Sequence, residues 1–162
     1  MKIKKSSTHF LRFVIFVMGA GALALAIFGL PALWQGGSEE FPQASRALLL
    51  IIVGLYLTMI PFFVALWQTL KLLRYIDENT AFSDLSVKAL RNIKYCGIII
   101  AVLYLGGGPL LLPIAEADDA PGLVVIGAAI AGAPIVIAVF AAVLERLLRS
   151  AIAIKSENDL TV

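Results

Sequence analysis

Four long stretches without a charged residue constrain this chain more than any other feature of its sequence. The stretches Phe13–Ser38, Ala47–Leu70, Tyr95–Ala115 and Ala120–Leu144 contain no Asp, Glu, Lys or Arg. Each reaches the roughly 18–20 residues that an α-helix needs to cross a hydrocarbon core of about 30 Å. Because a backbone in lipid must satisfy its own hydrogen bonds, such stretches form helices. The sequence therefore predicts an all-α, polytopic membrane protein with four transmembrane helices.

The composition agrees with one membrane domain that covers residues 1–162. Charged residues make up 15% of the chain, whereas soluble domains hold about 25%. We expect the four spans at about 13–34, 47–70, 95–115 and 122–144. A loop at 71–94 and a tail at 145–162 remain outside the lipid. The apolar run after residue 12 exceeds the 7–15 residues typical of a signal peptide, so the sequence favours an uncleaved first helix.

The basic residues predict how the chain lies in the membrane. Twelve of the 13 lie before the first span, in the 71–94 loop or in the tail, and Arg46 is the exception. The positive-inside rule then places both termini and this loop of a multi-pass protein in the cytoplasm. Topology explains these charges, so we expect no direct nucleic-acid binding.

Both cytoplasmic segments have helical patterns that extend the third and fourth spans. In the loop, Ser83 is a good N-cap and Phe82 before it can pack onto the apolar face of the new helix. Apolar residues then recur at helical spacing at Leu85, Ala89, Leu90 and Ile93. The tail has a similar stripe at Leu144, Leu147, Leu148, Ala151 and Ile154. We therefore expect cytoplasmic extensions of helices 3 and 4.

Two features inside the spans indicate how the helices are shaped and packed. Small residues recur at four-residue spacing in the first and fourth spans, which allows close helix approach. We expect these two helices to meet each other, or a neighbouring protomer in a homo-oligomer. The sequence Gly106-Gly107-Gly108-Pro109 interrupts the third span. A kink or an early exit from the membrane is the simplest reading, and a substrate-lining break of the kind found in transporters is the alternative.

With these segments in view, the chain resembles a family of bacterial four-helix membrane proteins of unknown function, domain of unknown function 2975. The resemblance rests on Ala81-Phe82-Ser83 followed by Val87, Leu90-Arg91 and Ile93, and on the closing residues Glu157–Val162. The family has no established activity, so it implies no catalytic residues. Its members are often encoded beside a small helix-turn-helix regulator of the Cro/CI type. The resemblance thus implies a membrane partner for such a regulator.

No pattern in the chain predicts an enzyme. The charge-free spans offer no general acid or base, and no HExxH, GxSxG or phosphate-binding glycine loop occurs. We expect no catalytic residue, no cofactor and no metal. Glu116, Asp118 and Asp119 could bind a cation weakly, but an acidic outer loop explains them as well. The single cysteine, Cys96, fits a packing residue.

The sequence therefore favours a regulatory or interaction protein that acts through its cytoplasmic loop and tail. Exposed apolar groups rimmed by charge are the usual anchors of protein contacts. The candidate contact residues are Asp77, Glu78, Phe82, Leu85, Glu157, Asp159, Leu160 and Val162. The alternatives are a small transporter or exporter subunit, and a purely structural membrane protein. The expected partners are the lipid bilayer and a cytoplasmic helix-turn-helix regulator.

Overall fold

The structure is a computed structural model that describes the backbone of residues 5–160 and the side chains of residues 8–158. Three candidate contacts, Asp159, Leu160 and Val162, therefore have side chains outside the described residues. Every regular element of the described chain is a helix. Helix α1 (Lys5–Ala24) runs through one π turn (Leu25–Gly29) into α2 (Leu30–Glu40). The remaining helices are α3 (Ser45–Asp77), α4 (Asp84–Gly107), α5 (Leu111–Ala117) and α6 (Gly122–Leu160).

These elements form four helical rods that are long and apolar enough to cross a membrane. The rods are Thr8–Glu40, Pro42–Asp77, Asp84–Ala117 and Gly122–Asn158. The prediction of four membrane-spanning helices is confirmed. At a rise of about 1.5 Å per residue, rods of 33 to 37 residues are near 50 Å long and exceed the hydrocarbon thickness. Helix α4 begins before its charge-free stretch and α6 continues after its own, so both helices have the extensions that the sequence predicted.

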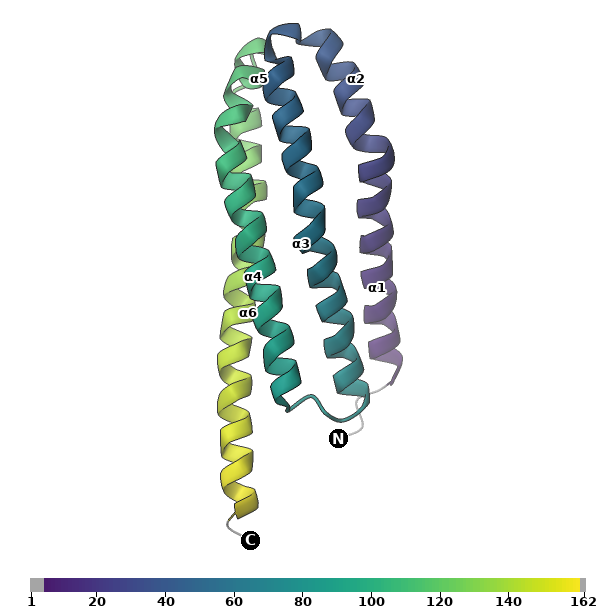
Figure 1. Ribbon diagram of the computed structural model, residues 1–162, viewed down its shortest axis with the longest axis vertical. Coiled ribbons are helices and arrows are strands. Elements are labelled where there is room, and N and C mark those ends of the chain that lie inside the picture. The colour runs from purple at the N-terminus through teal and green to yellow at the C-terminus, as the bar shows by residue number, and fades with distance from the viewer. Residues whose placement is uncertain (1–4, 161–162) are drawn as a thin grey trace.

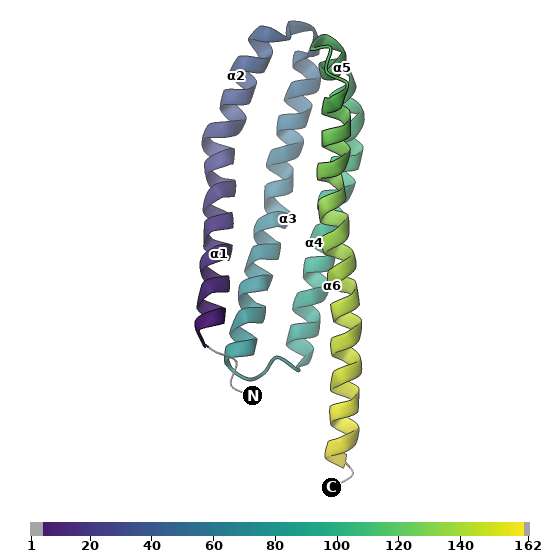
Figure 2. The ribbon, with the colours of Figure 1, turned by 180° about the vertical axis from the view of Figure 1, so that it is seen from behind.

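The rods lie side by side, with α1–α2 at one edge and α6 at the other (Figures 1 and 2). Helix α4 packs on both α3 and α6, whereas α1 packs mainly on α3. The prediction that the first and fourth helices meet within one chain is therefore wrong. The small residues of the first and fourth rods pack against other helices instead. A side chain built at Gly19 would contact Leu66 of α3, and Ala131, Ala138 and Ala141 of α6 are buried.

Helices α4 and α6 approach each other closely at Gly97. A Cβ atom added there would lie 2.9 Å from the backbone oxygen of Pro134 and 3.0 Å from the Cβ of Ala138. Real Cβ atoms do not approach a backbone oxygen so closely, so glycine is required. Ala101, one turn along α4, is also buried. Gly97 and Ala101 thus have the small-xxx-small spacing that lets two membrane helices approach closely.

The interruption at Gly106–Pro109 does not end the third rod. Helix α4 ends at Gly107, one 3₁₀ turn covers Gly108–Leu110, and α5 continues to Ala117. The rod therefore continues through the break, which is a local change of helix type. Proline is tolerated there because it occupies the first positions of the new turn, where its missing N–H has no helical partner to lose.

The π turn in the first rod was not predicted from the sequence. It lies between Ala24 and Leu30, within the charge-free stretch. A π turn disturbs the regular pairing of helix carbonyls, and in lipid those groups must find partners. Tyr56 of α3 supplies one, since its hydroxyl donates a hydrogen bond of 2.7 Å to the Ala26 carbonyl oxygen. This bond ties the first rod to α3 within the membrane region.

The start of α4 corrects one expectation. Ser83 is the N-cap residue, but its side chain makes no capping bond, and its Oγ is buried without a partner. Leu85 is 57% exposed, as a contact residue must be, whereas Ser86, Val87 and Ala89 are buried. Because α4 packs on two neighbours, its buried face is wider than one apolar stripe and is turned away from Leu85.

Replacing Ser83 by alanine should therefore change the free energy of unfolding by less than about 0.5 kcal/mol, as for residues without a specific role. Loss of a functioning N-cap would cost about 0.5–2 kcal/mol. Chemical unfolding in detergent, with amide exchange over residues 84–92, measures the difference. A loss above about 1 kcal/mol would show that the hydroxyl caps the helix after all.

Candidate interaction site

One end of the molecule gathers the segments expected outside the lipid, and we call it the basic end. It holds residues 8–12, 71–94 and 145–158. The tight turn between α3 and α4 begins where Asn79 takes a positive φ of 58°, a conformation that asparagine tolerates better than most residues. The Thr80 N–H then donates to the Tyr75 carbonyl oxygen at 2.8 Å and closes the end of α3. Sequence and geometry agree on this turn.

An apolar groove lies at the basic end, between the α3–α4 turn and α6. Its volume is about 410 Å³. Phe82 is 61% exposed and Leu147 is 62% exposed, so the groove opens to the surface. Ser86 is the one polar residue among its ten lining residues, which are Leu72, Ile76, Ala81, Phe82, Ser86, Leu90, Leu144, Leu147, Leu148 and Ala151. The segments that line it come from the loop and the tail that the sequence singled out.

The predicted acidic contacts already have partners within the chain. The Asp77 carboxylate binds Arg12 at 2.7 Å and so joins the start of α1 to the end of α3. The Glu78 carboxylate binds Arg74, four residues before it on α3, at 2.7 Å. Both pairs are partly exposed, so solvent screening keeps the contribution of each to stability small. Neither carboxylate is therefore an unpaired charge available to a partner protein.

The remaining described candidates lie around the groove or away from it. Phe82 lines it, and Leu85 does not. Glu157 is exposed in the last turns of α6, which extend past the α3–α4 turn (Figure 1). The structure thus brings Phe82 together with the apolar residues of the tail helix. It does not gather the five candidates with described side chains into one site.

A buried carboxylate cluster joins α4 to α6 beside the groove. Glu145 is only 6% exposed. Its Oε1 accepts hydrogen bonds from the Arg91 Nε at 3.0 Å and the Arg149 Nη2 at 2.9 Å, and its Oε2 accepts one from the Lys94 Nζ at 2.8 Å. The bond from Lys94 is the largest cause that lowers the pKa of Glu145, followed by the bond from Arg91, while burial acts against them. Glu145 directly follows the charge-free stretch and lies outside it.

This cluster was not predicted from the sequence, although two signals for it are present there. Glu145 and Arg149 are four residues apart on one helix face, and Arg91 and Lys94 are three apart on another. A lone carboxylate at the very end of a span needs a cation to be buried. What the sequence lacks is the information that α4 and α6 are neighbours.

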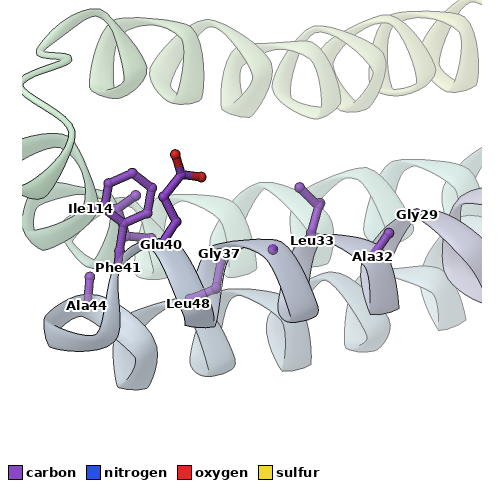
Figure 3. Close-up of a pocket in the computed structure, with 10 residues that line it drawn as sticks. Gly29, Ala32, Leu33, Gly37, Glu40, Phe41, Ala44, Leu48 and Ile114 are labelled. Atoms are coloured by element: carbon purple, nitrogen blue, oxygen red, sulfur yellow. The ribbon is translucent and has the colours of Figure 1, made fainter.

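Two further cavities lie within or near the membrane region, and both are apolar. One of about 330 Å³ lies between α3, α4 and α6 and is lined in part by Gly107 and Gly108 of the helix break. The other, of about 520 Å³, lies between α2, α3 and Ile114 of α5. Figure 3 shows Glu40 as the one carboxylate among its drawn lining residues. Neither cavity brings together polar groups that could orient a reactant.

The acidic residues between α5 and α6 lie in an exposed loop, since Glu116, Asp118 and Asp119 are all exposed. Within the part of the chain that the structure describes, no three His, Cys, Asp or Glu side chains gather closely enough to hold a metal ion. Cys96 is buried and free, as a packing residue would be.

Comparison with known proteins decides the family. Residues 32–162 match the family described as "Protein of unknown function (DUF2975)". The chain belongs to the DUF2975 family. This DUF2975 protein is also 51% identical to the "Uncharacterized membrane protein YoaS" of Bacillus subtilis (strain 168), over 99% of this chain and 100% of the relative. No solved structure matches it. The family and this relative support an integral, multi-pass membrane protein and name no activity.

Proposed function

We propose that this DUF2975 protein is a regulatory membrane protein that binds a cytoplasmic partner through the apolar groove at its basic end. One observation carries the proposal. Nearly all of the groove is built from residues outside the charge-free stretches, in segments that the topology prediction leaves outside the lipid. Exposed apolar surface costs about 25 cal/mol per Å² relative to burial. A soluble partner that covers Phe82 and Leu147 recovers this free energy.

The shape of the groove favours a partner helix. It runs between the α3–α4 turn and one face of α6, and grooves of this kind hold the apolar face of an amphipathic helix. The family resemblance implies a helix-turn-helix regulator of the Cro/CI type, which would present such helices. Since Asp77 and Glu78 already bind Arg12 and Arg74, the anchor in this proposal is Phe82 rather than acidic competition with DNA.

The proposal requires the basic end to face the cytoplasm of a bacterial inner membrane. The concentration of Lys and Arg there supports that orientation. On a Cys96→Ser background, Thr80→Cys should resist an impermeant thiol reagent added to intact cells, whereas Asp118→Cys at the other end should react. Both positions are exposed. Labelling of Thr80→Cys in intact cells would show that the basic end faces away from the cytoplasm and would refute the proposal.

A substitution in the groove tests the partner contact. Phe82→Ser should lower recovery of the cytoplasmic partner by about tenfold or more, the size expected for a contact worth over about 1.4 kcal/mol. It should also change a reporter of the neighbouring operon. Ile154→Ser is the matched control, because Ile154 is equally exposed at 61% but does not line the groove.

The two variants together keep the test specific. Both should insert in the membrane at wild-type levels, since both residues lie outside the charge-free stretches. If the wild-type protein retained no cytoplasmic partner, or if both variants bound and regulated like the wild type, the regulatory role would be refuted. The small-transporter and purely structural alternatives would then be favoured.

A further inference from the structure

A second cavity at the basic end lies on a different face of α6 from the groove. Its volume is about 680 Å³, and it is lined by Lys94, Val139, Ala142, Val143, Glu145, Arg146 and Arg149. At about 100° per residue on a helix, these α6 residues centre on the side away from Leu144, Leu148 and Ala151 of the groove. The two cavities can therefore be occupied independently.

The lining of this cavity changes character at the membrane boundary. Val139, Ala142 and Val143 lie in the charge-free stretch that ends at Leu144, and the charged residues follow directly. The cavity is thus apolar on the lipid side and ionic on the water side. A phospholipid has the same order of groups, with acyl chains below a charged phosphate.

The ionic half of the cavity carries excess positive charge. Glu145 is the one carboxylate among the lining residues, against Lys94, Arg146 and Arg149. It also binds Arg91 from outside the lining. One carboxylate cannot neutralise these cations, and it holds several of them in fixed positions. The side chains of Arg91 and Arg149 remain 44% and 52% exposed.

The guanidinium groups have donors left for an anion. An arginine offers five N–H donors, and Arg149 uses its Nη2 toward Glu145 while half of its side chain stays exposed. Arg146 is exposed on the same lining. Arginine and lysine side chains bind phosphate oxygens through short, charge-assisted hydrogen bonds. Basic pockets between membrane helices at the headgroup level have this chemistry.

We propose that this cavity binds the phosphate headgroup of an anionic phospholipid, with its acyl chains against Val139, Ala142 and Val143. Arg146, Arg149 and Lys94 hold the phosphate, and Glu145 positions the cations without touching the lipid. The bound lipid bridges α4 and α6 at the membrane surface. This site does not depend on the partner proposed above.

Native mass spectrometry of the full-length protein in neutral detergent tests the site, with phosphatidylglycerol and phosphatidylcholine as probes. The protein should retain phosphatidylglycerol in preference to phosphatidylcholine. Arg146→Gln should weaken phosphatidylglycerol binding about fivefold, the effect of one basic side chain at a membrane surface. Lys155→Gln removes the same charge from α6 outside the cavity and should leave the affinity unchanged.

Three results would overturn the proposal. Equal retention of the two lipids would show that the cavity has no preference for an anion. Equal losses in Arg146→Gln and Lys155→Gln would show diffuse surface charge rather than a site. Inorganic phosphate that displaces phosphatidylglycerol completely at millimolar concentration would assign the cavity to a free anion instead. Arg146 is exposed and takes no part in the ion pairs of Glu145 with Arg91, Lys94 and Arg149, so its substitution leaves the fold intact.

Discussion

Replacing Gly97 by alanine should force α4 and α6 apart and destabilise the protein by about 1–3 kcal/mol, the usual cost of overpacking a well-packed contact. The new methyl group would lie 2.9 Å from the Pro134 backbone oxygen, which cannot move aside as a flexible side chain can. This contact joins the two helices that also carry the Glu145 cluster. Gly97→Leu should prevent the pair from forming.

Gly132→Ala is the matched control, because it adds the same methyl group to α6 where nothing lies within 4 Å. It should be neutral or stabilising by up to about 1 kcal/mol, since alanine favours a helix over glycine. Unfolding titrations in detergent give both values. If Gly97→Ala were as stable as Gly132→Ala, the close approach of α4 and α6 would be wrong.

Replacing Glu145 by glutamine should have the second large effect. It leaves Arg91, Lys94 and Arg149 next to one another without the carboxylate that binds all three. Removing one partner of a fully buried ion pair costs about 3–5 kcal/mol. Here the three cations are 23% to 52% exposed, so solvent screening reduces the expected cost to about 1–3 kcal/mol.

Two comparisons isolate that effect. Glu78→Gln removes a carboxylate from a more exposed pair and should leave the free energy of unfolding almost unchanged. Arg91→Gln leaves Glu145 with Lys94 and Arg149, so it should cost less than Glu145→Gln. Equal stability of the Glu145→Gln and Glu78→Gln variants in detergent unfolding would contradict the central position of Glu145.

The lowered pKa of Glu145 gives this contribution a pH dependence. A carboxyl group whose pKa is lower in the folded state stabilises the fold fully above its unfolded pKa, near about 4.3, and loses this as the pH falls through the folded value. The wild type should therefore lose its advantage over Glu145→Gln only in strongly acidic solution. An advantage that vanished near neutral pH would contradict the ion-pair geometry.

The positions of the rods could be predicted from the sequence, because the requirement that lipid imposes on a chain depends only on the order of its apolar and charged residues. Charge-free stretches must be helical and must span, so Phe13–Ser38 and Ala120–Leu144 could be placed from their composition. Ser83 likewise marked the start of α4 correctly. The extension of α6 followed from its apolar stripe beyond Leu144.

The sequence could not predict which rods are neighbours. In a helix that is apolar all round, hydrophobic periodicity does not distinguish a lipid-facing side from a packed one. The small residues of the first and fourth spans were therefore expected to meet, although α1 packs on α3 and α6 packs on α4. The Glu145 cluster was missed for the same reason, since two of its cations come from α4.

The candidate site was predicted only in part. Phe82 and the tail stripe were identified because apolar residues beyond the lipid are unusual in themselves. The ion pairs of Asp77 and Glu78 depend on where Arg12 and Arg74 point, and side-chain direction is not readable from spacing alone. Leu85 is exposed, as a contact residue must be, but it does not line the groove that Phe82 lines.

The most direct test of the proposed contact is photocrosslinking from the groove in living cells. A benzophenone amino acid in place of Phe82 should crosslink to one cytoplasmic protein, which under the proposal is a helix-turn-helix regulator. The same probe in place of Phe28, which is 73% exposed within the first rod, should crosslink to no soluble protein. A probe at position 82 that yields no protein adduct, or the same adducts as position 28, would contradict a partner site at the basic end.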